Sequence, residues 1–88
     1  MLPTKSQFQT AATKWESTYE ALKLYERGKP MSALARIRWA YPDMTVEMFN
    51  MTIMMNQMNG YLLGGKITPK GHEYYKSMIS GAFEMANR

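Results

Sequence analysis

The chain has 88 residues, of which 45% are hydrophobic, and 11 basic and 7 acidic side chains give it a net charge of +4. This length suits a single domain over residues 1–88 and is too short for two. The absence of cysteine, together with a single histidine, excludes disulfides, thiolate zinc sites and zinc sites built from histidine. The absence of cysteine indicates a reducing compartment, so we expect a cytoplasmic protein. Because the sequence has no secretory signal and no apolar run of about 20 residues, we do not expect it to enter a membrane.

Apolar residues recur at steps of three and four near the N-terminus, which predicts a first helix over residues 6–26. This apolar stripe consists of Phe8, Ala12, Trp15, Tyr19 and Leu22. Thr4 or Ser6 is expected to cap the helix. Gly28 suits the left-handed position after a helix, and Pro30 cannot continue one, so the first helix should end just before them.

A second, shorter helix is predicted over residues 32–40, with Ser32 as its N-cap. The segment around it contains bases and no acid, and these bases are Arg27, Lys29, Arg36 and Arg38. The segment is either a phosphate-binding patch or a solvated surface. Trp39 lies near Arg36 on the helix and is a cation–π partner, an interface anchor or an ordinary, partly buried tryptophan.

The third helix is predicted to start at a cap, Asp43 or Thr45, and to reach about residue 59, where Gly60 ends it. It contains one acid, Glu47, and no base. Val46, Phe49 and Ile53 share one face, while Met48, Met51, Met55 and Met58 lie nearly opposite. Two interpretations stay open: the methionine face is packed between the first and last helices, or it is exposed until a partner or a second copy covers it.

A hairpin is predicted over residues 61–68, because Gly64-Gly65 separates two short apolar runs and both central positions of a type I′ turn require positive φ. Thr68 and Pro69 are typical of the N-cap and first position of a helix. The apolar stripe of this last helix consists of Tyr75, Met78, Ala82 and Ala86, with Ile79 and Phe83 beside it.

Two short motifs surround the predicted hairpin. Gly60-Tyr61-Leu62 precedes it, and Ile67-Thr68-Pro69-Lys70-Gly71 follows its turn. Both resemble the wing region of small winged helix-turn-helix proteins. The resemblance implies a mainly α fold with three helices, a short two-stranded hairpin and a C-terminal helix, and it is only topological over residues 32–59. The small size and the composition also resemble those of proteins encoded by phages or other mobile elements.

In that family the third helix enters the major groove of DNA and the wing touches the backbone. The resemblance therefore implies a small, dimeric transcription regulator that binds double-stranded DNA. The residues so implied are Asn50 and Gln57 facing bases, with Lys66, Lys70, Arg36 and Arg38 contacting phosphates.

A second hypothesis comes from the third helix itself. It has no cation to hold it on phosphates, and phosphate would repel Glu47. The chain would then be a protein-interaction module that does not bind DNA, either a homodimer or the partner of a host factor. Its interface would consist of Met48, Met51, Met54, Met55 and Met58.

Catalysis is not indicated. His72 lies beside Lys70 and Glu73, without a nearby nucleophile or second metal ligand, and is expected to be an exposed surface residue. Most of the six tyrosines are expected to form rims of the core with hydroxyls at the surface, rather than to stack on bases. They are Tyr19, Tyr25, Tyr41, Tyr61, Tyr74 and Tyr75. We expect no enzymatic activity, cofactor or metal.

Overall fold

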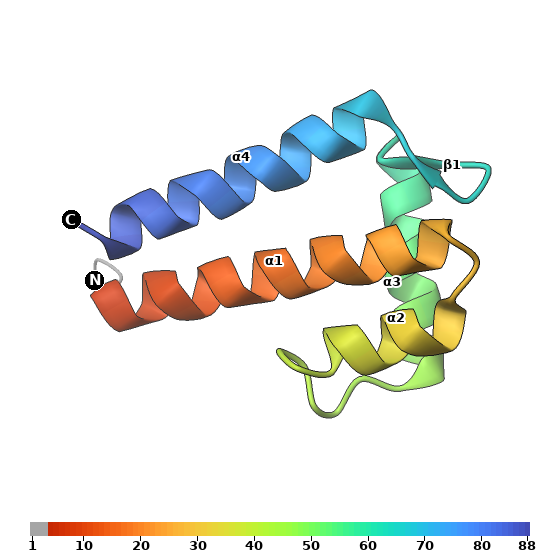
Figure 1. Ribbon diagram of the computed structural model, residues 1–88, viewed down its shortest axis with the longest axis horizontal. Helices are drawn as coiled ribbons and strands as arrows, with labels where there is room; N and C mark the ends of the chain where they lie inside the picture. The colour runs from red at the N-terminus through yellow and green to blue at the C-terminus, as the bar shows by residue number, and fades with distance from the viewer. Residues whose placement is uncertain (1–3) are drawn as a thin grey trace.

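The computed structural model describes residues 4–88 as four helices and a two-stranded antiparallel hairpin (Figure 1). In chain order these are α1 (Lys5–Glu26), α2 (Pro30–Ile37), α3 (Val46–Met58), β1 (Leu62–Leu63), β2 (Lys66–Ile67) and α4 (Pro69–Ala86). The mainly α class and the predicted order of elements are confirmed. Within the described residues, no helix has both the length and the apolar character needed to cross a membrane.

Three threonines fix where the long helices begin. The Thr4 Oγ1 accepts from the backbone N–H of Gln7 at 3.2 Å, and the Gln7 side chain accepts from the Thr4 N–H at 2.8 Å. Thr45 and Thr68 accept in the same way from N–H groups in the first turns of α3 and α4, at 3.1 and 3.0 Å. Each bond satisfies a backbone donor that the first turn of a helix leaves free.

The predicted start of the second helix at Ser32 is wrong. Helix α2 begins at Pro30, whose missing N–H costs nothing at the first helical position. It also ends earlier than predicted, at Ile37. The backbone N–H groups of Trp39 and Ala40 bond to carbonyls three residues back, both at 3.2 Å, so the chain tightens into a turn.

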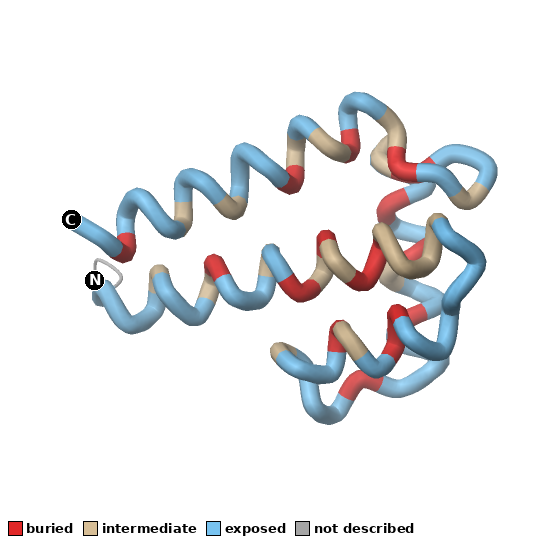
Figure 2. Tube along the Cα trace, viewed as in Figure 1, coloured by how far each residue is buried: buried red, intermediate tan, exposed pale blue. Residues whose placement is uncertain are grey.

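The core forms where α1 meets the other elements at its C-terminal half. Figure 1 shows α1 and α4 as a long antiparallel pair, with α2 on another side of α1 and α3 crossing at one end. The buried stretches of α1, α2 and α3 face one another there (Figure 2). The core residues are Tyr19, Ala21, Leu22, Ala33, Leu34, Ile37, Met44, Phe49, Ile53, Leu62, Ile67 and Tyr75.

The hairpin is fastened to the end of α1. Its turn has the predicted backbone, with φ of 58° at Gly64 and 77° at Gly65. The register pairs Leu62 with Ile67 and Leu63 with Lys66. The Glu26 carboxylate accepts from the Ile67 N–H at 2.7 Å, and the Lys66 Nζ donates to the Glu26 carbonyl at 3.2 Å. These bonds stabilise a hairpin that would be marginal alone.

Candidate functional site

The most exposed apolar surface on a single element is one side of α3, which we call the methionine ridge. Its members and their exposed fractions are Met48 (48%), Met51 (56%), Met54 (51%), Met55 (57%) and Met58 (79%). The interpretation that packs this face between the first and last helices is therefore wrong. Helices α2 and α4 pack mainly on α1, and α3 has core neighbours on one side only.

The opposite side of α3 enters the core through Phe49 and Ile53, which are 4% and 6% exposed. Val46 was predicted to share this buried face, but it is 51% exposed because the helix starts there, at the edge of the core. With two large apolar anchors and a threonine cap, α3 is held firmly while its ridge faces solvent. Nothing within residues 4–88 therefore covers the ridge.

A buried polar pair sets the rotation of α3. Asn56 is 6% exposed, and its Oδ1 accepts from the Tyr75 hydroxyl of α4 at 2.6 Å, while its Nδ2 donates to the Thr52 carbonyl at 2.8 Å. Burial raises the pKa of Tyr75 to about 12, because it penalises the phenolate, although the bond to Asn56 acts in the other direction. Asn56 was not predicted as a functional residue, although its spacing from Phe49 and Ile53 places it on the buried face.

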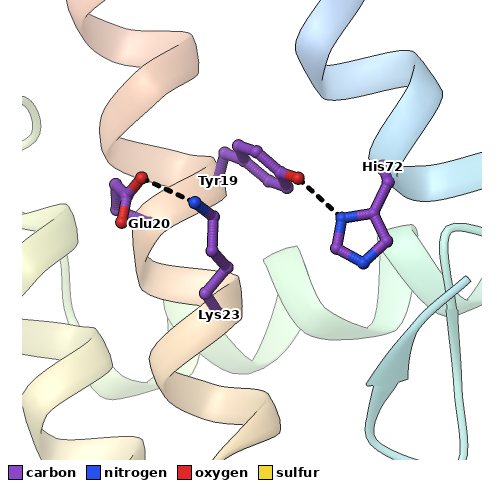
Figure 3. A network of polar contacts seen from close by, with 4 residues as sticks. All are labelled: Tyr19, Glu20, Lys23 and His72. Atoms are coloured by element: carbon purple, nitrogen blue, oxygen red, sulfur yellow. Dashed lines mark hydrogen bonds and ion pairs between the residues drawn. The ribbon is translucent and has the colours of Figure 1, made fainter.

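His72 is not the exposed residue that the sequence suggested. It is half-buried, and its Nδ1 lies 2.6 Å from the hydroxyl of Tyr19, which is 5% exposed (Figure 3). The Tyr19 ring also carries the Lys23 ammonium 4.4 Å from its centroid, and Lys23 pairs with Glu20 at 2.9 Å. The prediction of rim positions with surface hydroxyls is wrong for Tyr19 and Tyr75, since both are buried.

The Tyr19–His72 contact ties α1 to α4. Tyr19 also stacks on Tyr75, with ring centroids 5.6 Å apart. In residues 4–88, no three His, Asp or Glu side chains come together where they could hold a metal ion. The arrangement is one of aromatic packing with hydrogen-bonded hydroxyls, and it stabilises the contact between α1 and α4.

The four bases predicted to contact phosphates each donate to the chain itself. The Lys66 Nζ bonds to the Glu26 carbonyl at 3.2 Å, the Lys70 Nζ to the Asn59 carbonyl at 3.0 Å, the Arg36 guanidinium to the Ser17 hydroxyl at 2.9 Å, and the Arg38 Nε to the Met44 carbonyl at 2.9 Å. They are spread over α2, the turn after it, the hairpin and α4. The four bases have four different hydrogen-bond acceptors, in Glu26, Asn59, Ser17 and Met44.

Arg36 and Trp39 form a cation–π pair, with the guanidinium 4.1 Å from the ring centroid. This confirms one of the three interpretations of Trp39. The interpretation as a partly buried tryptophan is wrong, since Trp39 is 75% exposed.

The surroundings of the ridge are two amides, one acid and one base. Asn50 and Gln57, the predicted base-reading residues, are exposed on α3. Glu47 lies in the first turn of α3, and Lys70 donates to the carbonyl of Asn59, the C-cap residue after α3. The ridge is therefore an apolar strip with an uncharged polar flank, an acid at one end and a base at the other.

A hollow of about 250 Å³ opens beside Met55. Its walls include Asn59, the C-cap of α3, and the rings of Trp15, Tyr61 and Tyr74. Trp15 meets Tyr74 edge-on at 5.6 Å, and Tyr61 stacks on Tyr74 at 4.2 Å, so these walls support one another. An aromatic wall with an amide beside it suits a large side chain brought by a partner.

A scan against models of known protein families found no match, and neither did searches among curated proteins and among solved structures. The function is therefore inferred from the geometry of this surface.

Proposed function

We propose that this chain is a winged-helix-like module that binds an amphipathic helix of another protein through the methionine ridge. The observation that carries the proposal is the exposure of the ridge on a helix without a single basic residue. Met48, Met51, Met55 and Met58 follow one another at steps of three and four, which is the spacing of a seam between two helices. Methionine adapts to irregular apolar partners, and exposed apolar patches mark interfaces.

The polar groups around the ridge define the partner more closely. Glu47 at one end favours a base on the bound helix, and Lys70 at the other end favours an acid. The hollow beside Met55 favours an aromatic anchor. Because α3 has 13 residues and rises about 1.5 Å for each, the bound segment should be a helix of about four turns.

DNA reading by α3 has less support. Phosphate contacts supply nearly all of nonspecific DNA affinity, yet α3 has no base. Glu47 would meet the phosphates of a groove into which α3 entered. A duplex is therefore an alternative outcome of the experiment and not a second proposal.

The test uses protein whose methionine methyl groups are labelled with carbon-13. The probe is a designed amphipathic peptide with a leucine seam, a central tryptophan, a lysine at one end and a glutamate at the other. We expect the signals of Met51, Met54, Met55 and Met58 to shift, while that of Met44, which is 7% exposed, stays in place. A control peptide with glutamines in the seam should shift none of them.

A short DNA duplex at low salt is the second titrant. If the duplex binds with a Kd below about 10⁻⁴ M and moves the α3 signals in a salt-dependent way, α3 is a DNA-contacting helix and the proposal is wrong. Absence of any ridge shift with the leucine peptide would also count against it.

A matched pair of variants locates the surface. Met51→Glu places a charge on the ridge, and Met31→Glu makes the same change on α2 at a residue that is 73% exposed. Both should stay folded, since substitutions at exposed sites usually change the free energy of unfolding by less than about 0.5 kcal/mol. We expect Met51→Glu to weaken peptide binding at least about tenfold, because the seam must then bury an unpaired charge, and Met31→Glu to leave it unchanged. Equal affinities for the two variants would contradict a site on α3.

A further inference from the structure

We infer that the free end of the α1–α4 pair is a dimer interface that takes a second copy of this chain. We call this end the arm, formed by residues 5–15 of α1 and 77–86 of α4. Figure 1 shows that the arm extends away from α3 and the hairpin, and that the start of α1 and the end of α4 lie there side by side. Ala12 and Ala86, both 0% exposed, are the buried residues of the contact. Two helices alone can bury only the stripe between them.

One face of the arm is hollowed into an apolar groove of about 370 Å³. The groove is lined by Phe8, Ala11 and Trp15 from α1 and by Ser77, Met78, Gly81, Ala82 and Met85 from α4. The side chains at its middle are small, with Ala11 and Gly81 on facing helices, and the side chains at its ends are large. Small residues let a second backbone approach, and large ones can fill the hollow of an identical surface.

The charge distribution favours a second copy as the occupant. A two-fold dimer sets the same patch of both subunits against each other, so any cluster of one charge sign in it would repel itself. All eight residues that line the groove are uncharged, although the chain as a whole carries +4. The groove is therefore a place where two copies meet without charge repulsion, and their four helices form a bundle with a shared core.

The size of the groove sets the expected affinity. Standard interfaces use about 20–30 residues on each side, which is more than the groove and its rim provide. The dimer should therefore dissociate on dilution. Sedimentation equilibrium and light scattering over a range of protein concentrations are the measurements, with a mass approaching twice that of the chain at high concentration.

Gly81→Glu is the decisive variant. A Cβ at Gly81 would meet nothing within 4 Å, so a side chain fits the single chain without a clash. Replacing a glycine inside a helix also favours the folded state, and circular dichroism should therefore show a folded protein. We expect the dimer Kd to rise at least about tenfold, because a charge would be buried at the centre of the interface. Ser80→Glu, the same charge one residue away and outside the groove, should leave the Kd unchanged.

Three results would overturn the assignment. The first is a wild-type chain that stays monomeric at every concentration at which it is soluble. The second is a Gly81→Glu variant that dimerises as well as Ser80→Glu. The third is dissociation of the dimer by Met51→Glu, which would place the interface on the methionine ridge instead. Because Met51→Glu is also the test of peptide binding, failure of the dimer and failure of the proposed function can be told apart.

Discussion

Replacing Tyr75 by phenylalanine tests how α3 is held in place. The Tyr75 ring is 3% exposed and stacks on Tyr19 with centroids 5.6 Å apart, and a phenylalanine ring can keep that contact. What disappears is the hydroxyl that donates to Asn56 at 2.6 Å. The variant therefore removes one hydrogen bond between α4 and α3 and very little apolar contact.

The cost follows from what remains. The Asn56 Oδ1 keeps its burial but loses its donor, and a buried polar atom without a partner costs about 1–3 kcal/mol. Total stabilities of small domains are about 5–15 kcal/mol, so this is a measurable fraction. Replacing both partners, as in Tyr75→Phe with Asn56→Leu, should destabilise the chain by less than the sum of the two single changes, because no unpaired polar atom is left.

Urea denaturation followed by circular dichroism measures these free energies of unfolding, and similar m-values would show that the unfolding transition is unchanged. The wild type, the two single variants and the double variant form a double-mutant cycle. If Tyr75→Phe alters the free energy by less than about 0.5 kcal/mol, the pair does not hold α3. If the double variant costs the full sum of the two single changes, the two groups are not coupled, and the reasoning is wrong.

Two more predictions concern α4. The pKa of Tyr75 is about 12 in the folded chain against 10.0 in the unfolded chain. The stability linked to its protonated hydroxyl is therefore fully present below pH 10 and is lost as the pH rises through 12. Alkaline unfolding should therefore show a loss of about 2–3 kcal/mol that is missing in Tyr75→Phe. Among the helical glycines, Gly71→Ala should destabilise by about 1–3 kcal/mol, because its Cβ would overlap the Tyr61 carbonyl oxygen. Gly81→Ala should stabilise the fold by about 0.5–1 kcal/mol, measured by thermal denaturation at concentrations that keep the chain monomeric. Equal effects of the two substitutions would contradict both of these predictions.

The sequence was most informative where the structural cause is local. Gly64-Gly65 allows the positive φ values of a tight turn, and Thr68-Pro69 favours a helix start, with little dependence on distant residues. The second helix was less well predicted because two local signals compete. Pro30 can end one helix or begin another, and a serine two residues later is an equally acceptable cap, so only the packing of α2 on α1 decides.

The site was harder to predict because periodicity identifies apolar faces and not their neighbours. Two such faces on α3 are compatible with burial on both sides or on one. The outcome depends on α1, which takes α2 and α4 as its main partners and leaves α3 with a single covered face. Asn56 and His72 were missed for a related reason: their partners, Tyr75 and Tyr19, are 19 and 53 positions away, and no local pattern connects them.

The methionines of the ridge and the residues of the groove lie on different elements, and Trp15 is the one residue that lines both the groove and the hollow beside Met55. This arrangement has a consequence for binding. In the proposed dimer each copy keeps its own ridge, because the interface uses residues 8–15 and 77–85 and none of α3. Two ridges on one particle would bind a target that carries two helices more tightly than a target that carries one, without any new contact. Gly81→Glu should therefore reduce affinity for a tandem-helix target and leave affinity for the single peptide as it is. Met51→Glu should weaken both, which separates the contribution of the ridge from that of the dimer.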